Sequence, residues 1–492
     1  MKSERNDIEK NVVATNFLWR FLERFGAQGV SLIVSIILAR LLEPETYGII
    51  ALVTIFTSIM NVFIDSGMGN ALIQKKDADD LDFSTVFYFN IVVCLGLYTL
   101  MFVAAPLIAQ FYNMPELTLI VRVLSLTLLI SGTKNVQQAY ISRNMMFKKF
   151  FFATLSGTII AAIVGIVMAY KGYGVWALVA QQLVNVTIGT IILWFTVKWR
   201  PKLVFSIQRL QGLFSYGWKL LVSNIINTVY GNIQQLLIGK MYSYNALAYY
   251  NQGKSYPEVI VNNVNVAIDS VLLPTMSKVQ DDRSAVKAMT RRSIMVSTYI
   301  LAPVMVGIAA TSRQFVSVLL TDKWLPSVPF LVIFCITFIF YPIHTANLNA
   351  IKAMGRSDLY LKLEVAKKSI GIILLLSTMR FGVMAMALSL LVNSVFSQII
   401  NAWPNKKLLS YSYGEQLRDI SPSLLLSLTM GIVVWSIGYL VNVPNIIVLL
   451  IQLVVGVLVY FVGSILTKNE AYIYGLSIIK GLLKRSNEKC LM

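Results

Sequence analysis

The chain has 492 residues, of which 57% are hydrophobic and only 13% are charged, whereas about a quarter of the residues in a soluble globular domain are charged. The apolar residues come in long runs, such as residues 91–109 and 446–466. A run of about 20 apolar residues is enough to cross the hydrocarbon core of a bilayer. This composition excludes a soluble fold and indicates a protein that crosses a membrane many times.

The apolar runs predict an all-α integral membrane fold with about fourteen transmembrane helices. In chain order they cover residues 16–41, 46–67, 83–109, 117–139, 151–170, 174–197, 212–240, 246–272, 289–310, 328–351, 359–378, 382–403, 422–441 and 445–467. The polar segment 1–10 has no apolar core followed by a cleavage site. We therefore expect the first helix to be retained and to act as its own insertion signal.

Basic residues are concentrated in alternate loops between these helices. If the N-terminus lies inside, the cytoplasmic loops and the two termini hold 30 of the 42 basic residues, and the opposite loops hold 4. Because cytoplasmic loops of membrane proteins carry an excess of Lys and Arg, this distribution predicts that both termini are cytoplasmic. The net charge of +19 is thus mainly a signal of topology, and we expect no nucleic acid partner.

The chain also resembles a duplication with a period near 200 residues. The segment "ILARLLEPETYGIIAL" corresponds to "LIGKMYSYNALAYYNQ" in the second half. Because each half holds an even number of helices, the two halves share one orientation. This parallel pseudo-repeat predicts two six-helix lobes followed by two C-terminal helices. The expected divisions are an N-terminal lobe (1–199), a cytoplasmic linker (200–211), a C-terminal lobe (212–405), helices thirteen and fourteen (406–467) and a cytoplasmic tail (468–492).

Three further features point away from a metal or a cofactor. The three cysteines, Cys94, Cys335 and Cys490, are too few and too scattered for a disulfide framework or a metal cluster. The acidic run at residues 77–82 resembles a metal site only superficially, and we expect it to be a solvated turn. No Gly-rich phosphate-binding loop is present, so direct use of ATP is not expected.

Four of the predicted helices carry polar residues along one face. The spacing of three or four residues places them on one side of an α-helix. The stripes are Arg20, Arg24, Gln28, Ser31 and Ser35 on helix one; Thr54, Ser58, Asn61 and Asp65 on helix two; Lys219, Ser223, Asn227, Tyr230 and Gln234 on helix seven; and Asn251, Lys254, Glu258, Asn262, Asn265 and Asp269 on helix eight.

Such stripes predict a wet central cavity, since one charge at the centre of a bilayer costs about 2.5–3.5 kcal/mol. The cavity is expected to be cationic and to suit an anionic cargo such as a diphosphate. The candidate substrate-binding residues are Arg20, Arg24, Gln28, Lys219, Asn227, Lys254 and Arg122. The candidates for ion coupling are Glu23, Glu258, Asp65 and Asp269. Two alternatives stay open: Arg20 and Arg24 could snorkel to the headgroups, and Lys254 and Glu258 could form a purely structural pair.

Several segments resemble the polysaccharide transporter family, and in particular its branch of Wzx-type flippases typified by the colanic-acid exporter. The segments are "SGMGNALIQKKDADDLDFSTVFYFN", "RPKLVFS", "LLPTMSKVQDDRSAVKAMTRR" and "VLLTDKWLPSVPFL". This family belongs to the multidrug, oligosaccharidyl-lipid and polysaccharide superfamily. The resemblance implies two lobes in a V shape that open alternately to each side. In peptidoglycan-precursor relatives, helices one, two, seven and eight line the cavity, and two extra C-terminal helices form a groove for the lipid tail.

The resemblance implies a flippase for undecaprenyl-diphosphate-linked oligosaccharide, an O-antigen or exopolysaccharide repeat unit, in a bacterial inner membrane. The expected partners are this lipid-linked glycan, membrane lipid and polysaccharide assembly proteins, with the chain working as a monomer and not as an enzyme. Two alternatives stay open. One is a drug or small-solute antiporter of the same superfamily, and the other is a membrane glycan polymerase or glycosyltransferase.

Overall fold

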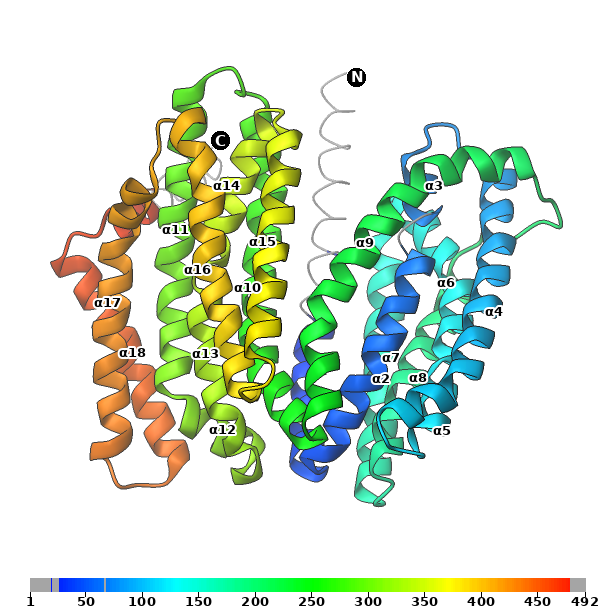
Figure 1. Cartoon of the computed structure of the whole chain (residues 1–492), viewed down its shortest axis with the longest axis horizontal. Coiled ribbons are helices and arrows are strands. Elements are labelled where there is room, and N and C mark those ends of the chain that lie inside the picture. The colour runs from blue at the N-terminus through cyan, green and yellow to red at the C-terminus, as the bar shows by residue number, and fades with distance from the viewer. Residues whose placement is uncertain (1–18, 20–25, 66–67, 478–492) are drawn as a thin grey trace, which may run out of the picture. The chain divides into compact units, whose positions relative to one another are not determined.

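The computed structural model describes residue 19, residues 26–65 and residues 68–477, and every regular element in this described part is a helix (Figure 1). By its internal contacts the chain forms two compact units, Met1–Ala248 and Tyr249–Met492. Contacts of α9 place it with the N-terminal helices. The sequence repeat instead predicts that α9 is the first helix of the C-terminal lobe, and that division stays a prediction.

The first unit contains a helix at Gly26–Leu41 followed by eight labelled helices. Here α7 packs along α8, α4 packs on α6, and α2 contacts both α6 and α9. The helices are α2 (Pro44–Asp65), α3 (Met68–Gln74), α4 (Asp80–Phe111), α5 (Leu117–Leu124), α6 (Leu126–Arg143), α7 (Phe147–Tyr170), α8 (Val175–Thr196) and α9 (Ile207–Met241).

The second unit contains most of α10 and all the helices that follow. Its α11 packs on α17, α17 packs on α18, and α15 packs on α16 (Figure 1). The elements are α10 (Tyr244–Ser277), α11 (Arg283–Ala310), α12 (Ser312–Leu320), the short 3-10 helix η1 (Asp322–Ser327), α13 (Val328–Phe338), α14 (Tyr341–Ala353), α15 (Ser357–Thr378), α16 (Val383–Leu408), α17 (Tyr413–Leu440) and α18 (Asn445–Leu466).

The described helices confirm the prediction of an all-helical integral membrane fold. Eleven of the described spans are long and apolar enough to cross a membrane. With the helix at Gly26–Leu41 and the more polar helices α9 and α15, they correspond to the fourteen predicted helices. In two places, one predicted helix is divided: residues 117–139 become α5 and α6, and residues 328–351 become α13 and α14.

Several helices begin earlier than their apolar runs, because a capping residue and not hydropathy sets the first turn. Ser206 caps α9 through the N–H of Arg209, which places the start of this helix inside the predicted linker. Asp282 caps α11 through two backbone N–H groups. Ser412 and Glu415 form a capping box at the start of α17. Apolar length therefore locates the part of a helix inside the bilayer and misses the turns that project beyond it.

The longer helices take in basic residues that lie between the predicted apolar runs. Arg209 lies within α9 and Lys287 lies within α11. Lys367 lies within α15. The Lys367 ammonium is 2.5 Å from the carboxylate of Glu364, and the two side chains are only 13% and 24% exposed. These residues are therefore parts of helix surfaces, and the loops themselves carry fewer cations than predicted.

The acidic run at residues 77–82 was expected to be a solvated turn; Asp77, Asp79 and Asp80 are indeed exposed, but Asp82 is not. Asp82 is fully buried, and both of its carboxylate oxygens lie 2.6 Å from the Lys75 ammonium. Asp79 forms a capping box with Asp82, and the N–H that Asp82 donates is the main reason that the pKa of Asp79 lies below its ordinary value of 3.8. Arg209 at the start of α9 lies 3.6 Å from each of these two carboxylates.

The first residues of α4 also contact the segment that joins α8 to α9. The hydroxyls of Ser84 and Thr85 accept hydrogen bonds from the backbone N–H groups of Lys202 and Ser206, at 3.0 and 3.2 Å. The ammonium of Lys202 is 2.6 Å from the carboxylate of Asp80. The residues of the family-like motif "DADDLDFST" thus fasten the start of α4 to the segment 202–209.

Candidate functional site

The polar stripe of α10 is preserved as a partly exposed face of this helix. The Lys254 ammonium lies 3.3 Å from the Glu258 carboxylate, with the lysine side chain 18% and the glutamate side chain 40% exposed. Asn262 and Asp269, farther along the helix, are exposed. The structure therefore forms the Lys254–Glu258 pair that the sequence left as one alternative, and one partner of the pair remains well exposed.

The far end of this stripe is tied to α14. Asn265 accepts a hydrogen bond from the hydroxyl of Thr345 at 3.1 Å, and Asp269 accepts one from the amide of Asn349 at 2.7 Å. Both bonds join the same two helices four residues apart, so they fix the rotation of α10 against α14. A change in the charge of Asp269 would act directly on this contact.

Behind α14 lies a buried cluster of amides that joins it to α16 and α17. Asn347 and Gln416 exchange two hydrogen bonds, of 2.9 and 3.0 Å. Asn405 donates to the side-chain oxygen of Asn347 at 2.7 Å. All three residues have an exposure of 0%. Buried amides that satisfy one another specify a unique packing of helices, so this cluster fixes the position of α14 and, through it, of the α10 stripe.

His344 on α14 lies next to this cluster. Its Nδ1 is 3.3 Å from the amide nitrogen of Asn401, and its Nε2 is 3.5 Å from the hydroxyl of Ser394. Both partners are on α16. The imidazole thus has a neutral partner on each side, which is the arrangement of a structural histidine.

The other candidate residues fall into three groups. Arg20, Glu23 and Arg24, and the side chains of Asp65 and Lys219, lie outside the described residues. Gln28 is partly buried and Asn227 is exposed. Arg122 on α5 donates from Nε to the carbonyl of Phe102 on α4 at 3.2 Å, and its guanidinium lies 4.0 Å from the centre of that ring. Their roles in binding stay predictions.

Two cations that lie inside helices were not identified as such from the sequence. Lys134 on α6 lines a cavity of about 100 Å³ between α6, α7 and α8, together with Thr154 and Asn185. Lys367 on α15 pairs with Glu364. Each is a charge inside a helix rather than in a loop, and a search for single charges within apolar runs would have found Lys134. Lys367 was hidden because it follows other cations at the start of its helix.

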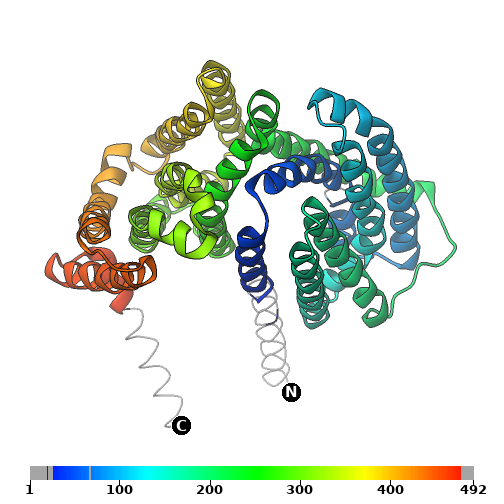
Figure 2. The ribbon, with the colours of Figure 1, turned by 90° about the horizontal axis from the view of Figure 1, so that it is seen from below.

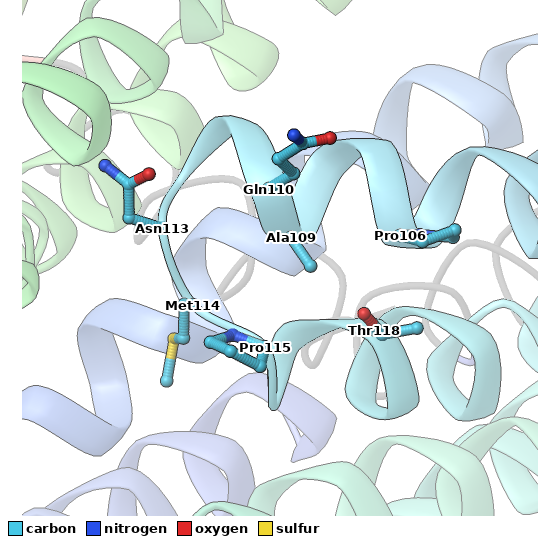
Figure 3. Close-up of a pocket in the computed structure, with 7 residues that line it drawn as sticks. All are labelled: Pro106, Ala109, Gln110, Asn113, Met114, Pro115 and Thr118. Atoms are coloured by element: carbon cyan, nitrogen blue, oxygen red, sulfur yellow. The ribbon is translucent and has the colours of Figure 1, made fainter.

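One hollow in the first unit is neutral. It has a volume of about 460 Å³ and lies between the end of α4 and the start of α5. Ala109 and Thr118 face each other across it, and Gln110 and Asn113 stand at its edge (Figure 3). None of its described lining residues is charged. It therefore has no cation to pair with an anionic headgroup and is not the candidate site.

Comparison with known proteins places the chain among proteins of polysaccharide biosynthesis. Residues 37–329, more than half of the chain, match the family described as polysaccharide biosynthesis protein. The teichuronic acid biosynthesis protein TuaB of Bacillus subtilis (strain 168) is 26% identical over 78% of this chain and 80% of its own length. The lipopolysaccharide biosynthesis protein WzxC of Escherichia coli (strain K12) is 22% identical over 83% of this chain and 84% of its own.

Two solved structures share the fold. The inward closed conformation of the lipid II flippase MurJ superimposes with a TM-score of 0.75 over 92% of this chain and 99% of that one, at 15% identity. An inward-facing multidrug resistance MATE family transporter superimposes with a TM-score of 0.61 over 77% and 94%, at 12% identity. At such identities the likeness concerns the fold alone.

Proposed function

The chain belongs to the polysaccharide biosynthesis protein family, and from this premise we propose that it is a flippase that moves a lipid-linked oligosaccharide across the membrane. The names of its relatives support this proposal. TuaB and WzxC are named for the biosynthesis of teichuronic acid and of lipopolysaccharide. A third relative, ExoT of Rhizobium meliloti (strain 1021), is named a succinoglycan biosynthesis transport protein and is 25% identical over 64% of each chain. The cargo we infer is an undecaprenyl-diphosphate-linked O-antigen or exopolysaccharide repeat unit.

The observation that carries the proposal is the polar, partly exposed face of α10 in a chain made of membrane-spanning helices. A face of this kind is costly against lipid, and it is inexpensive where it lines water or a polar cargo. Lys254 would bind a phosphate oxygen of the cargo by a charge-assisted hydrogen bond. Asn262 and the neighbouring amides would bind sugar hydroxyls.

Movement of the cargo would follow alternating access. The polar head would enter from the cytoplasmic side while the polyprenyl tail remains in lipid, and the two lobes would then open to the other side. The Lys254–Glu258 pair gives a physical route for coupling to ions, because cargo phosphate competes with Glu258 for the same ammonium. Displacement of Glu258 would leave it free to take up a proton or a cation. Asp269, held by Asn349, is the second coupling candidate.

The finer assignments belong to the same proposal. We place the protein in a bacterial inner membrane with both termini in the cytoplasm, because the basic residues are distributed in that way. It would work without catalysis and as a monomer, and it would receive its cargo from polysaccharide assembly proteins.

The test is a measurement of the sidedness of lipid-linked sugar in cells that lack this protein. The cells are complemented with the wild type, with Lys254→Ala, or with Lys171→Ala, whose cation is exposed at the end of α7. We expect linked sugar to accumulate on the cytoplasmic face without the protein, and export to return with the wild type and with Lys171→Ala but not with Lys254→Ala.

Two other outcomes would correct the proposal. If sidedness is normal without the protein but chain length or sugar content changes, the protein is a polymerase or a transferase and not a flippase. If Lys254→Ala restores export fully, the flippase stands and the binding role of Lys254 is wrong. Gradient-dependent transport that is unchanged in Glu258→Gln would remove Glu258 from the coupling scheme.

A further inference from the structure

A second site is suggested by a cavity of about 830 Å³ within the second unit, a volume within the usual range of about 300–1,000 Å³ for ligand pockets. It lies between α11, α13 and α17, where α17 and α18 run beside α11 (Figure 2). Its walls are mainly aliphatic, and Ile336 and Ile432 on them are 40% and 65% exposed. The cavity is therefore open at the surface of the unit.

The length of the cavity corresponds to one leaflet of a bilayer. Its lining on α13 and the C-cap of this helix runs from Val328 to Ile339, which at 1.5 Å per residue is about 16 Å. The hydrocarbon core of a bilayer is about 30 Å thick, so this is about half of it. The cavity ends at Ser312 and Arg313 and at the turn between α17 and α18, both of which the distribution of basic residues predicts to lie outside.

The outer end of the cavity has the chemistry of a headgroup site. Arg313 is exposed, and it is the one charged residue among the described residues that line the cavity. Trp435 and Tyr439 line the same end, with ring centres 4.6 Å apart and exposures of 53% and 71%. Trp and Tyr gather at the membrane–water interface, and a guanidinium binds phosphate by paired hydrogen bonds.

We propose that this cavity holds one acyl chain of an anionic diacyl phospholipid of the outer leaflet, with the headgroup phosphate on Arg313. The chain lies against α13 and α17, and the aromatic pair marks the depth of the glycerol region. A phospholipid fits better than a cargo tail, because the cavity has the length of one leaflet and a transported lipid has to leave one leaflet for the other. This site is independent of the proposed transport function.

The test measures lipid retained by the full-length protein after reconstitution with phosphatidylglycerol and phosphatidylethanolamine and extraction into mild detergent, by native mass spectrometry. In Arg313→Ala we expect retained phosphatidylglycerol to fall about tenfold, the effect of one lost charge-assisted hydrogen bond. Arg380→Ala is the matched control, because Arg380 is also exposed and predicted to lie outside but does not line the cavity. Its retention should equal that of the wild type.

A photoactivatable phosphatidylglycerol with the reactive group on its acyl chain locates the site. We expect crosslinks to the lining segments of α13 and α17, and we expect Ile336→Trp, which fills the cavity, to remove them while Arg313 is present. Equal retention in wild type and Arg313→Ala, or crosslinks confined to other helices, would overturn the proposal. Displacement of the probe by a polyprenyl diphosphate but not by unlabelled phosphatidylglycerol would assign the cavity to the cargo and would equally overturn it.

Discussion

The substitution Asp82→Asn tests how much the buried ion pair between Asp82 and Lys75, at the start of α4, contributes to stability. Asp82 and Asp80 each lie 2.6 Å from a lysine, Lys75 and Lys202 respectively. The two pairs differ in burial: Asp82 has a side-chain exposure of 0%, whereas Asp80 and Lys202 are 51% and 65% exposed. Asparagine retains the shape of the side chain and an oxygen for the N–H of Asp79. The change therefore removes the charge and replaces one of the two oxygens that accept from Lys75 by an amide NH2 group.

The expected magnitudes follow from the burial. Removal of one partner from a buried ion pair costs about 3–5 kcal/mol, because the other charge remains without compensation. Lys75 is 29% exposed and can recover some hydration, so we expect a loss of about 3 kcal/mol in the free energy of unfolding for Asp82→Asn. For Asp80→Asn we expect a loss of only about 0–1 kcal/mol, the usual value for an exposed pair.

The assay is reversible unfolding in mild detergent micelles titrated with dodecyl sulfate, followed by tryptophan fluorescence. Trp199 is a local reporter, since its ring centre is 5.7 Å from that of Phe83, the neighbour of Asp82. Lys75→Met combined with Asp82→Asn should recover part of the loss, because the uncompensated cation is then removed. If Asp80→Asn and Asp82→Asn cost the same, burial does not determine the strength of these pairs and the reasoning is wrong.

Three further predictions concern packing, pH and the amide cluster. Gly48→Ala should destabilise the first unit by about 1–3 kcal/mol, because an added Cβ would lie 2.0 Å from the carbonyl oxygen of Tyr244. Gly29→Ala is the control, since an added Cβ there would have nothing within 4 Å. It should not destabilise the first unit in the same unfolding assay. The pKa of Asp282 is lowered from 3.8, mainly by the hydrogen bond from the hydroxyl of Ser284. The stability that this N-cap contributes to α11 should therefore be present at neutral pH and be lost as the pH falls below about 4. The melting temperature of Asp282→Asn should lack this part of the pH dependence. Asn347→Ala should lower the free energy of unfolding by about 2–3 kcal/mol, since it leaves buried donors and acceptors unpaired. A double-mutant cycle with Gln416→Ala that shows no coupling energy would contradict the two hydrogen bonds between these side chains.

Much of the fold could be predicted from the sequence, because the bilayer imposes a local requirement. Each span needs about 20 apolar residues and satisfies its own backbone hydrogen bonds as a helix. The number and order of the membrane-spanning segments, and the polar face of α10, follow from the residues of each segment alone. The ends of α9, α11 and α17 could not be read in this way, since they project beyond the apolar runs and are set by caps.

The chain by itself thus determined that this is an all-helical membrane protein with a cation and a carboxylate, Lys254 and Glu258, on one face of a spanning helix. Only the tertiary structure decided which polar residues become partners. It placed Asn347 against Gln416, 69 residues away along the chain, and it buried Asp82 in a turn that composition alone describes as solvated. The physical reason is that hydropathy and helical spacing are properties of neighbouring residues, whereas burial and hydrogen-bond partners depend on how distant helices pack.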